Sequence, residues 1–134
     1  MLTLQVQDHA KPPVFSNIPV PTLDAHQILI HTAACALNFA DLLMIRGTYQ
    51  ETPALPFTLG MEVSGNVAAI GSAVTSFKIG DRVAAFSGSG GLAEFCAVDV
   101  SRCLIISKNL PFETAAAALI SYGTSHLALT HRAK

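Results

Sequence analysis

The fold of this chain is decided by residues 60–71, which read GMEVSGNVAAIG, and by residues 80–83, which read GDRV. The middle of the first stretch has the β-branched and small residues of a buried strand. Its glycines stand where a chain turns or where another backbone approaches closely. Asp81 marks a tight entry to a second strand at residues 82–86. The sequence therefore predicts a central strand followed, after a short loop, by another strand.

The composition is that of one domain with more apolar residues than its own core needs. The chain has 134 residues, of which 51% are hydrophobic and 13% are charged. Ordinary domains have roughly 25% charged residues, and this length suffices for a real hydrophobic core. The surplus apolar surface has two explanations, a homo-oligomer interface or contact with a further domain, and we favour the second.

Several classes of protein are disfavoured by charge and patterning. No apolar run approaches the roughly 18–20 residues that span a bilayer, and residues 1–11 lack the pattern of a signal peptide. We therefore expect a cytoplasmic protein that does not bind membranes. The net charge is −1 and no basic cluster is present, which argues against nucleic-acid binding. The cysteines form neither a disulfide framework nor a CxxC metal site.

Alternation, prolines and glycines predict several short strands and two helical regions. Asn38 is a plausible N-cap of a short helix that stops at Gly47. Asn109 is a possible cap of a second helix that runs towards the C-terminus, with a break expected near residues 122–123. The expected strands or extended runs are residues 2–7 (as an edge strand), 18–21, 27–32, 63–70, 82–86, 92–98 and 102–106. This pattern predicts a mainly β fold with α additions (α+β), a distorted β-barrel.

The glycine-rich stretch at residues 87–91 reads SGSGG and lies between two predicted strands. A phosphate-binding loop opens a helix, whose first amides bind the anion. No helix is predicted directly after residue 91, since the next expected element is the strand at residues 92–98. We therefore interpret the stretch as a flexible hairpin loop.

The order of several motifs resembles one known family. They are NFAD at 38–41, RGTY at 46–49, LP at 55–56, GME at 60–62, GDRV at 80–83, GLAEF at 91–95 and YGT at 122–124. This order is similar to the N-terminal, GroES-like catalytic domain of the zinc-independent quinone oxidoreductases, the zeta-crystallin-like branch of the medium-chain dehydrogenase/reductase superfamily. The resemblance implies that residues 1–134 are this GroES-like domain. Residues 111–134 would then be the helical start of the connection to a Rossmann cofactor domain that is missing from this chain, since no GxGxxG follows a strand.

The same resemblance indicates whether the chain has the ligands for a catalytic zinc ion. Zinc alcohol dehydrogenases share this fold and bind their catalytic metal through a Cys at the position of Asn38 and a His at the position of Met61. Neither an amide nor a thioether suits Zn²⁺. The resemblance therefore implies a zinc-independent enzyme that transfers hydride from NADPH to a small-molecule quinone or to an enone C=C bond. The full-length protein would be a homo-oligomer, a dimer, and this chain alone would be inactive.

Three side chains are candidate site residues by the same resemblance. Asn38 would face both the nicotinamide and the substrate, Tyr49 would line the substrate pocket and offer a phenol donor, and Thr124 would contact the nicotinamide ring. Leu43 stands where some relatives carry a second tyrosine, which bears on the donor assignment. From local sequence alone, Asn38 is equally explained as a helix cap and Tyr49 as a packing residue.

Other polar residues have structural interpretations. We expect Glu62 and Arg82 to form a buried ion pair between adjacent strands, and Met61 to line the pocket. The histidines show no metal-ligand spacing. A second function from another class stays open: a non-catalytic GroES-like binding or assembly module whose apolar surplus is an interface.

Overall fold

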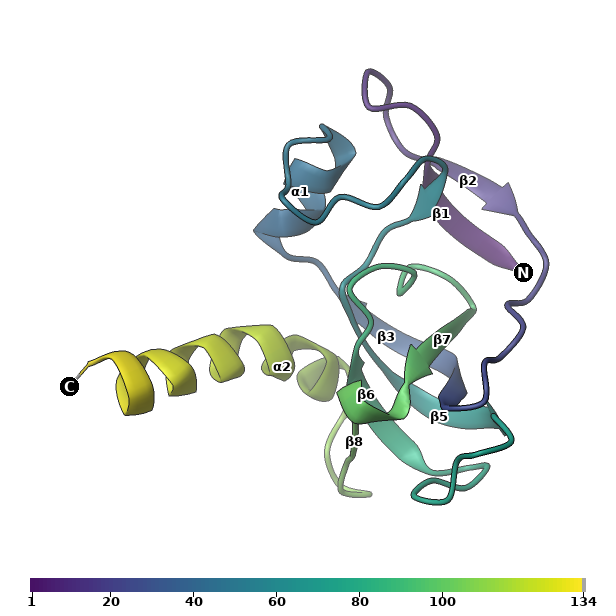
Figure 1. Cartoon of the computed structure of the whole chain (residues 1–134), viewed down its shortest axis with the longest axis vertical. Helices are drawn as coiled ribbons and strands as arrows, with labels where there is room; N and C mark the ends of the chain where they lie inside the picture. Colours follow the sequence, from purple (N-terminus) through teal and green to yellow (C-terminus); the bar gives the residue numbers. More distant parts are fainter. Residues whose placement is uncertain (134) are drawn as a thin grey trace.

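Two antiparallel sheets build the body of the protein, and one long helix leaves it (Figure 1). The computed structural model describes residues 1–133. The larger sheet has the order β7-β3-β5-β6-β8, with strands at Phe95–Asp99, Gln27–Ala36, Glu62–Ile70, Arg82–Phe86 and Cys103–Ile105. The smaller has the order β2-β1-β4, with strands at Val14–Asn17, Leu2–Val6 and Phe57–Thr58. The helices are α1 (Phe39–Ile45), η1 (Val100–Arg102), α2 (Phe112–Leu127) and its π-helical continuation η2 (Ala128–Arg132). The mainly β fold with helical additions is thereby confirmed.

Strand β5 is the central strand of the larger sheet, as residues 60–71 predict. It pairs with β3 on one side and β6 on the other. Its fully buried Val63 belongs to a core cluster with Ile30 of β3 and Val83 of β6. Gly65 is required here, because a Cβ at this position would lie 2.0 Å from the carbonyl oxygen of His31. A glycine thus lets β3 pass close to β5 near an irregularity in their register.

A second core cluster joins the smaller sheet to α1. It contains Val6 of β1, Met44 of α1, Phe57 of β4 and the neighbouring residues Leu59 and Met61. This cluster fixes α1 above the start of β5. The pocket described below lies at the edge of that junction.

Only the first part of α2 packs on the larger sheet. Ala115 and Ala116 are buried, whereas residues 121–133 are exposed. The hydroxyl of Ser64, on β5, donates to the carbonyl of Phe112 at 2.6 Å and anchors the helix start. Figure 1 shows the remainder of the helix extending away from the body, with the C-terminal end far from the N-terminus.

Some local predictions were wrong in detail. The strand at residues 2–7 lies in the middle of its sheet, not at an edge, and the next strand is β2, ahead of residues 18–21, where no strand forms. The loop at residues 87–91 is not a hairpin, since β6 pairs with β5 and β8 while β7 pairs with β3. Helix α2 begins at Phe112 with Pro111 as its N-cap and continues through residues 122–123 without a break.

The predicted ion pair of Glu62 and Arg82 is also wrong, and the strand register gives the reason. Arg82 pairs with Asn66, whereas Glu62 pairs with Phe86 at the other end of β6. Glu62 instead accepts hydrogen bonds from two amides, and Arg82 donates to the carbonyl of Leu110. The sequence predicts correctly that the two strands are adjacent, but not which of their residues pair with each other.

Among residues 1–133, no helix has the length and apolar character needed to cross a membrane.

Candidate functional site

A cavity of about 380 Å³ lies between α1, the start of β5, the end of β6 and the middle of α2. Its size is within the usual range for small-molecule sites, roughly 300–1,000 Å³. The lining residues are Asn38, Ala40, Tyr49, Met61, Phe86, Leu119, Ile120, Gly123, Thr124 and Leu127. The three candidate residues, Asn38, Tyr49 and Thr124, are therefore brought together by segments far apart in sequence. Met61 lines the same cavity, as expected.

Asn38 is both a helix cap and part of the cavity wall. It lies in extended conformation directly before α1, and its backbone N–H donates to the Asp41 carboxylate at 2.8 Å. Its side-chain Nδ2 donates to Oε1 of Glu62 at 3.0 Å. The backbone of Asn38 thus takes part in the helix cap, while its side chain belongs to the candidate site.

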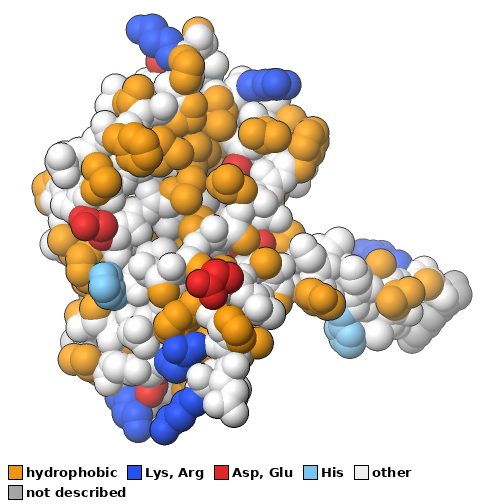
Figure 2. Space-filling view, turned by 180° about the vertical axis from the view of Figure 1, so that it is seen from behind, with side chains coloured by type: hydrophobic (Ala, Val, Ile, Leu, Met, Phe, Trp, Pro, Cys, Tyr) orange, Lys and Arg blue, Asp and Glu red, His pale blue; other side chains and the backbone are white. Residues whose placement is uncertain are grey.

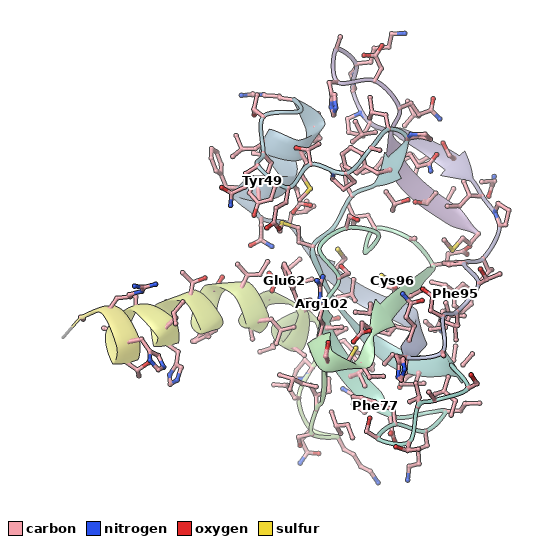
Figure 3. The ribbon with its side chains drawn as sticks, in the orientation of Figure 1. Tyr49, Glu62, Phe77, Phe95, Cys96 and Arg102 are labelled. Carbon is pink, nitrogen blue, oxygen red and sulfur yellow. The ribbon has the colours of Figure 1, made fainter. Side chains whose placement is uncertain are left out.

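Glu62 is the residue behind the cavity that sequence reasoning assigned to another role. It is 1% exposed and begins β5. Besides the Asn38 bond, its Oε2 accepts from the backbone N–H of Ile120, in α2, at 2.9 Å. Figure 3 shows Glu62 where the beginning of α2 meets the sheet. In the sequence, Glu62 is conspicuous as an acidic residue at the start of a predicted buried strand.

Asp41 is a second buried carboxylate that supports the site. It is 2% exposed, and its Oδ1 accepts from the backbone N–H of Gly60 at 3.0 Å. Gly60 has φ +98°, a conformation that disfavours side chains. Asp41 therefore ties the first turn of α1 to the turn that leads into β5, and holds Asn38 in place relative to Met61.

Tyr49 follows α1 and packs its ring against the second core cluster while also lining the cavity (Figure 3). Within residues 1–133 its phenol oxygen has no hydrogen-bond partner. The ring therefore has the packing role that local sequence suggested, and the hydroxyl is left available to a ligand. Leu43, where the resemblance implies a second tyrosine in some relatives, is not part of the cavity wall.

Thr124 and Leu127 form the outer wall of the cavity, on the exposed part of α2. This wall projects beyond the body of the protein (Figure 1). The part of the cavity wall that these two residues form is therefore exposed.

The glycine-rich loop does not resemble an anion site. The amides of Gly90, Gly91 and Leu92 donate to the carbonyls of Thr58, Gly60 and Leu59, and those of residues 87 and 88 both donate to Met61. Backbone amides already engaged in this way are not available to a phosphate. A strand, β7, follows the loop, as the sequence interpretation assumed.

The cysteine thiols have little nucleophilic character. Burial raises the pKa of Cys35 to about 12, that of Cys96 to about 11 and that of Cys103 to about 12. Thiols with such values are protonated at neutral pH, and it is the thiolate that reacts. In the described part of the chain no three His, Cys, Asp or Glu side chains are placed to hold a metal ion.

Fold and sequence define the class of this protein. The profile of the alcohol dehydrogenase GroES-like domain family matches residues 24–108. The chain belongs to this family, in the medium-chain dehydrogenase/reductase superfamily that the motif order indicates.

The relatives are quinone oxidoreductases. The chain is 45% identical over 112 residues to the quinone oxidoreductase-like protein 2 homolog of Nematostella vectensis, a match that covers 83% of this chain and 31% of that protein. A mycobacterial protein solved in complex with NADPH superposes with a TM-score of 0.91 at 31% identity, over 99% of this chain and 42% of that one. The quinone oxidoreductase of Thermus thermophilus, also solved with NADPH, gives a TM-score of 0.84 at 34% identity, over 96% and 40%.

These matches cover nearly the whole of this chain but well under half of its relatives. The chain spans about a third of the length of the curated relatives it matches. The relatives support the general class of oxidoreductases.

Proposed function

We propose that this chain is the catalytic domain of an NADPH-dependent oxidoreductase that transfers hydride to quinones or to enone C=C bonds. The observation that carries the proposal is the convergence of Asn38, Tyr49 and Thr124 on one cavity. Relatives named quinone oxidoreductases, two of them solved with NADPH, support the reaction class. We further expect zinc to play no part.

The cavity suits the nicotinamide end of such a cofactor and a flat acceptor beside it. Its walls are mostly apolar and aromatic, with Met61, Phe86 and Leu119 among them, and a few polar groups converge from α1 and α2. The rest of the dinucleotide needs a phosphate-binding surface, and the amides of residues 87, 88, 90 and 91 in the glycine-rich loop already donate to backbone carbonyls. Thr124, on the open side, is the residue that we assign to the nicotinamide ring.

When bound, NADPH supplies the hydride, and the residues of this chain orient the acceptor and stabilise its charge. A quinone or enone gains negative charge on its carbonyl oxygen as it is reduced, so preorganised donors near that oxygen lower the barrier. The Asn38 amide carries two hydrogens, of which Glu62 binds one, and the second can donate to the oxygen. The Tyr49 phenol is the second donor. Apolar walls exclude water and strengthen both interactions.

The second half of α2 is where we place the connection to the cofactor domain. Residues 111–134 are the helical start of this connection in the proposal, and residues 121–133 are exposed with large apolar side chains such as Leu127 and Leu129 among them. Apolar side chains also gather on the upper half of the body (Figure 2). The exposed large apolar residues of the chain include Phe15, Leu37 and Phe39. Exposed apolar surface on this scale supports cover by another domain or a second copy. We expect the full-length protein to be a cytoplasmic dimer.

The proposal is tested by NADPH oxidation with a benzoquinone and with a conjugated enone. The assay compares the 134-residue chain with the same chain extended by whatever its gene encodes downstream. We expect turnover by the extended form only, because hydride transfer needs donor and acceptor held in near-attack geometry. Turnover should fall on the order of tenfold or more for Asn38→Ala, since a donor to the developing oxyanion is lost.

The apolar surface also favours a second candidate, a binding or assembly module without catalysis. It predicts no NADPH oxidation by any form of the protein. It also predicts a stable complex between the exposed apolar face and another chain, which sedimentation would detect. Absence of turnover with both acceptors would refute the reductase proposal.

A further inference from the structure

Glu62 connects the two walls of the cavity without lining it. One of its hydrogen-bond partners, Asn38, belongs to the wall formed by α1, and the other, Ile120, belongs to the wall formed by α2. These partners lie 24 and 58 residues from Glu62 in sequence. A single buried side chain therefore holds together two elements that lie far apart in the sequence.

The chemistry of a carboxylate determines how the Asn38 amide is oriented. The Asn38 side chain presents its NH₂ group, and not its carbonyl oxygen, to Oε1 of Glu62, which accepts from it. The second Nδ2 hydrogen then points to another side of the amide group. Within residues 1–133 the side-chain Nδ2 makes no other hydrogen bond. Glu62 therefore selects which face of Asn38 is available in the cavity.

The position of α2 depends on the same carboxylate. The Ile120 N–H donates to Oε2 at 2.9 Å, while the neighbours of Ile120 in sequence and along the helix, Leu119 and Thr124, line the cavity. Both donors are N–H groups and the acceptor is nearly inaccessible to water, at 1% exposure. A buried carboxylate without hydrogen-bond partners is costly, so this pair of bonds strongly favours one arrangement of the walls.

We propose that Glu62 is a positioning residue of the active site, which acts through Asn38 and α2 by holding one amide hydrogen of Asn38 and the backbone amide of Ile120 at the same time. This inference rests on the proposed function. It assigns to Glu62 the preorganisation of the donor that stabilises the reduced acceptor. Its role is distinct from the ion pair predicted for it and from a contact with substrate.

The decisive substitution is Glu62→Gln, which keeps the shape of the side chain. A glutamine has one acceptor oxygen in place of two, and its NH₂ group cannot accept from an N–H donor. One of the two bonds must therefore be lost. In the extended protein we expect kcat and kcat/KM for quinone to fall together by roughly tenfold, as they do when an interaction made in the transition state is removed.

Ser64→Ala is the matched control. Ser64 lies two residues from Glu62 on β5, is fully buried, and also makes a hydrogen bond to α2, through the carbonyl of Phe112. Its removal takes away one buried bond between the same strand and the same helix, but does not touch Asn38. We expect a fall in melting temperature similar to that of Glu62→Gln with kcat unchanged. Equal losses of kcat in the two variants would assign Glu62 a structural role only.

A double variant tests whether Glu62 acts through Asn38. If it does, Glu62→Gln should reduce kcat much less when Asn38 is already alanine, because the donor that it orients is gone. A purely structural residue reduces kcat by the same factor in both backgrounds. Equal factors would overturn the proposal.

A measurement independent of turnover keeps this inference separate from the proposed function. In protein with ¹⁵N-labelled asparagine, the hydrogen-bonded Asn38 amide proton should exchange slowly with solvent in the wild type and in Ser64→Ala, and at least tenfold faster in Glu62→Gln. Unchanged exchange in Glu62→Gln would overturn the assignment, whatever the activity. Altered exchange in a protein that oxidises no NADPH would leave the orientation of Asn38 by Glu62 standing and refute the reductase function.

Discussion

The guanidinium carbon of Arg82 lies 3.7 Å from the centroid of the Phe112 ring. The same guanidinium donates through Nη2 to the carbonyl of Leu110. The side chain thus stacks on the first residue of α2 and binds the loop that leads into it, so it fixes where this helix begins. Glu62, the partner predicted from sequence, has no part in this arrangement.

Arg82→Lys should therefore destabilise the fold although it keeps the charge. A lysine ammonium has no planar group that could stack on the ring while donating to the carbonyl. We expect a loss of about 1–2 kcal/mol in the free energy of unfolding, measured by urea denaturation. Arg102→Lys is the control, because Arg102 is exposed and lies 5.9 Å from the ring of Phe86. Its effect should stay within about 0.5 kcal/mol, and an equal effect of both substitutions would contradict the stacking argument.

Gly65→Ala tests the close approach of β3 and β5. The added methyl group would lie 2.0 Å from the carbonyl oxygen of His31, a backbone atom that cannot move without breaking the central strand pairing. We expect a loss of about 3 kcal/mol or more in the free energy of unfolding. Gly123→Ala provides the contrast, since no atom lies within 4 Å of its added methyl group in α2. That substitution should be neutral or stabilise by up to about 1 kcal/mol.

The buried thiols predict a loss of stability at alkaline pH. The folded state holds the pKa of Cys35 and Cys103 at about 12 and that of Cys96 at about 11, all raised by burial. In the unfolded chain thiols ionise near pH 8.5. Above that pH the unfolded state binds fewer protons than the folded state, so the free energy of unfolding decreases as pH rises.

Urea denaturation at pH 8 and at pH 10 measures this effect. The urea midpoint should be lower at pH 10, and Cys96→Ala should reduce the difference because one of the three titrating thiols is removed. In the folded protein the thiols should also react slowly with a maleimide at pH 8, and rapidly after unfolding. A rapid reaction of all three thiols in the native state would contradict their burial.

Tyr49→Phe separates the phenol hydroxyl from the packing of the ring. The hydroxyl has no partner within residues 1–133, whereas the ring packs on the second core cluster. We expect the melting temperature to change by no more than a degree or two, and kcat/KM for quinone in the extended protein to fall roughly tenfold. The control is Tyr122→Phe, at the other tyrosine of the chain, which is 75% exposed and outside the cavity wall. Unaltered kinetics in Tyr49→Phe would remove the phenol from the proposed mechanism.

Local sequence patterns predicted which segments form strands and helices better than they predicted which of these segments lie side by side. Residues 62–70 were identifiable as a central strand because a run of small and β-branched residues bounded by glycines suits a strand covered on both sides. The edge position assigned to residues 2–7 was wrong, since alternation reports which face of a strand is buried and says nothing about how many strands it pairs with. The loop at residues 87–91 joins strands that pair elsewhere, which no local signal records.

In the candidate site, too, the sequence identified the residues and the tertiary structure decided which of them meet. Asn38, Tyr49 and Thr124 were selected by resemblance, and the tertiary structure places them around one cavity. Their functional roles stay predictions. The tertiary structure also decided what the sequence could not, that Glu62 binds two amides and that Arg82 stacks on Phe112. Sequence by itself determined the residue types, the central strand and the family. Register between strands and the position of α2 determined which polar groups meet, because those contacts join residues 24 to 58 positions apart and depend on the packing of the whole chain.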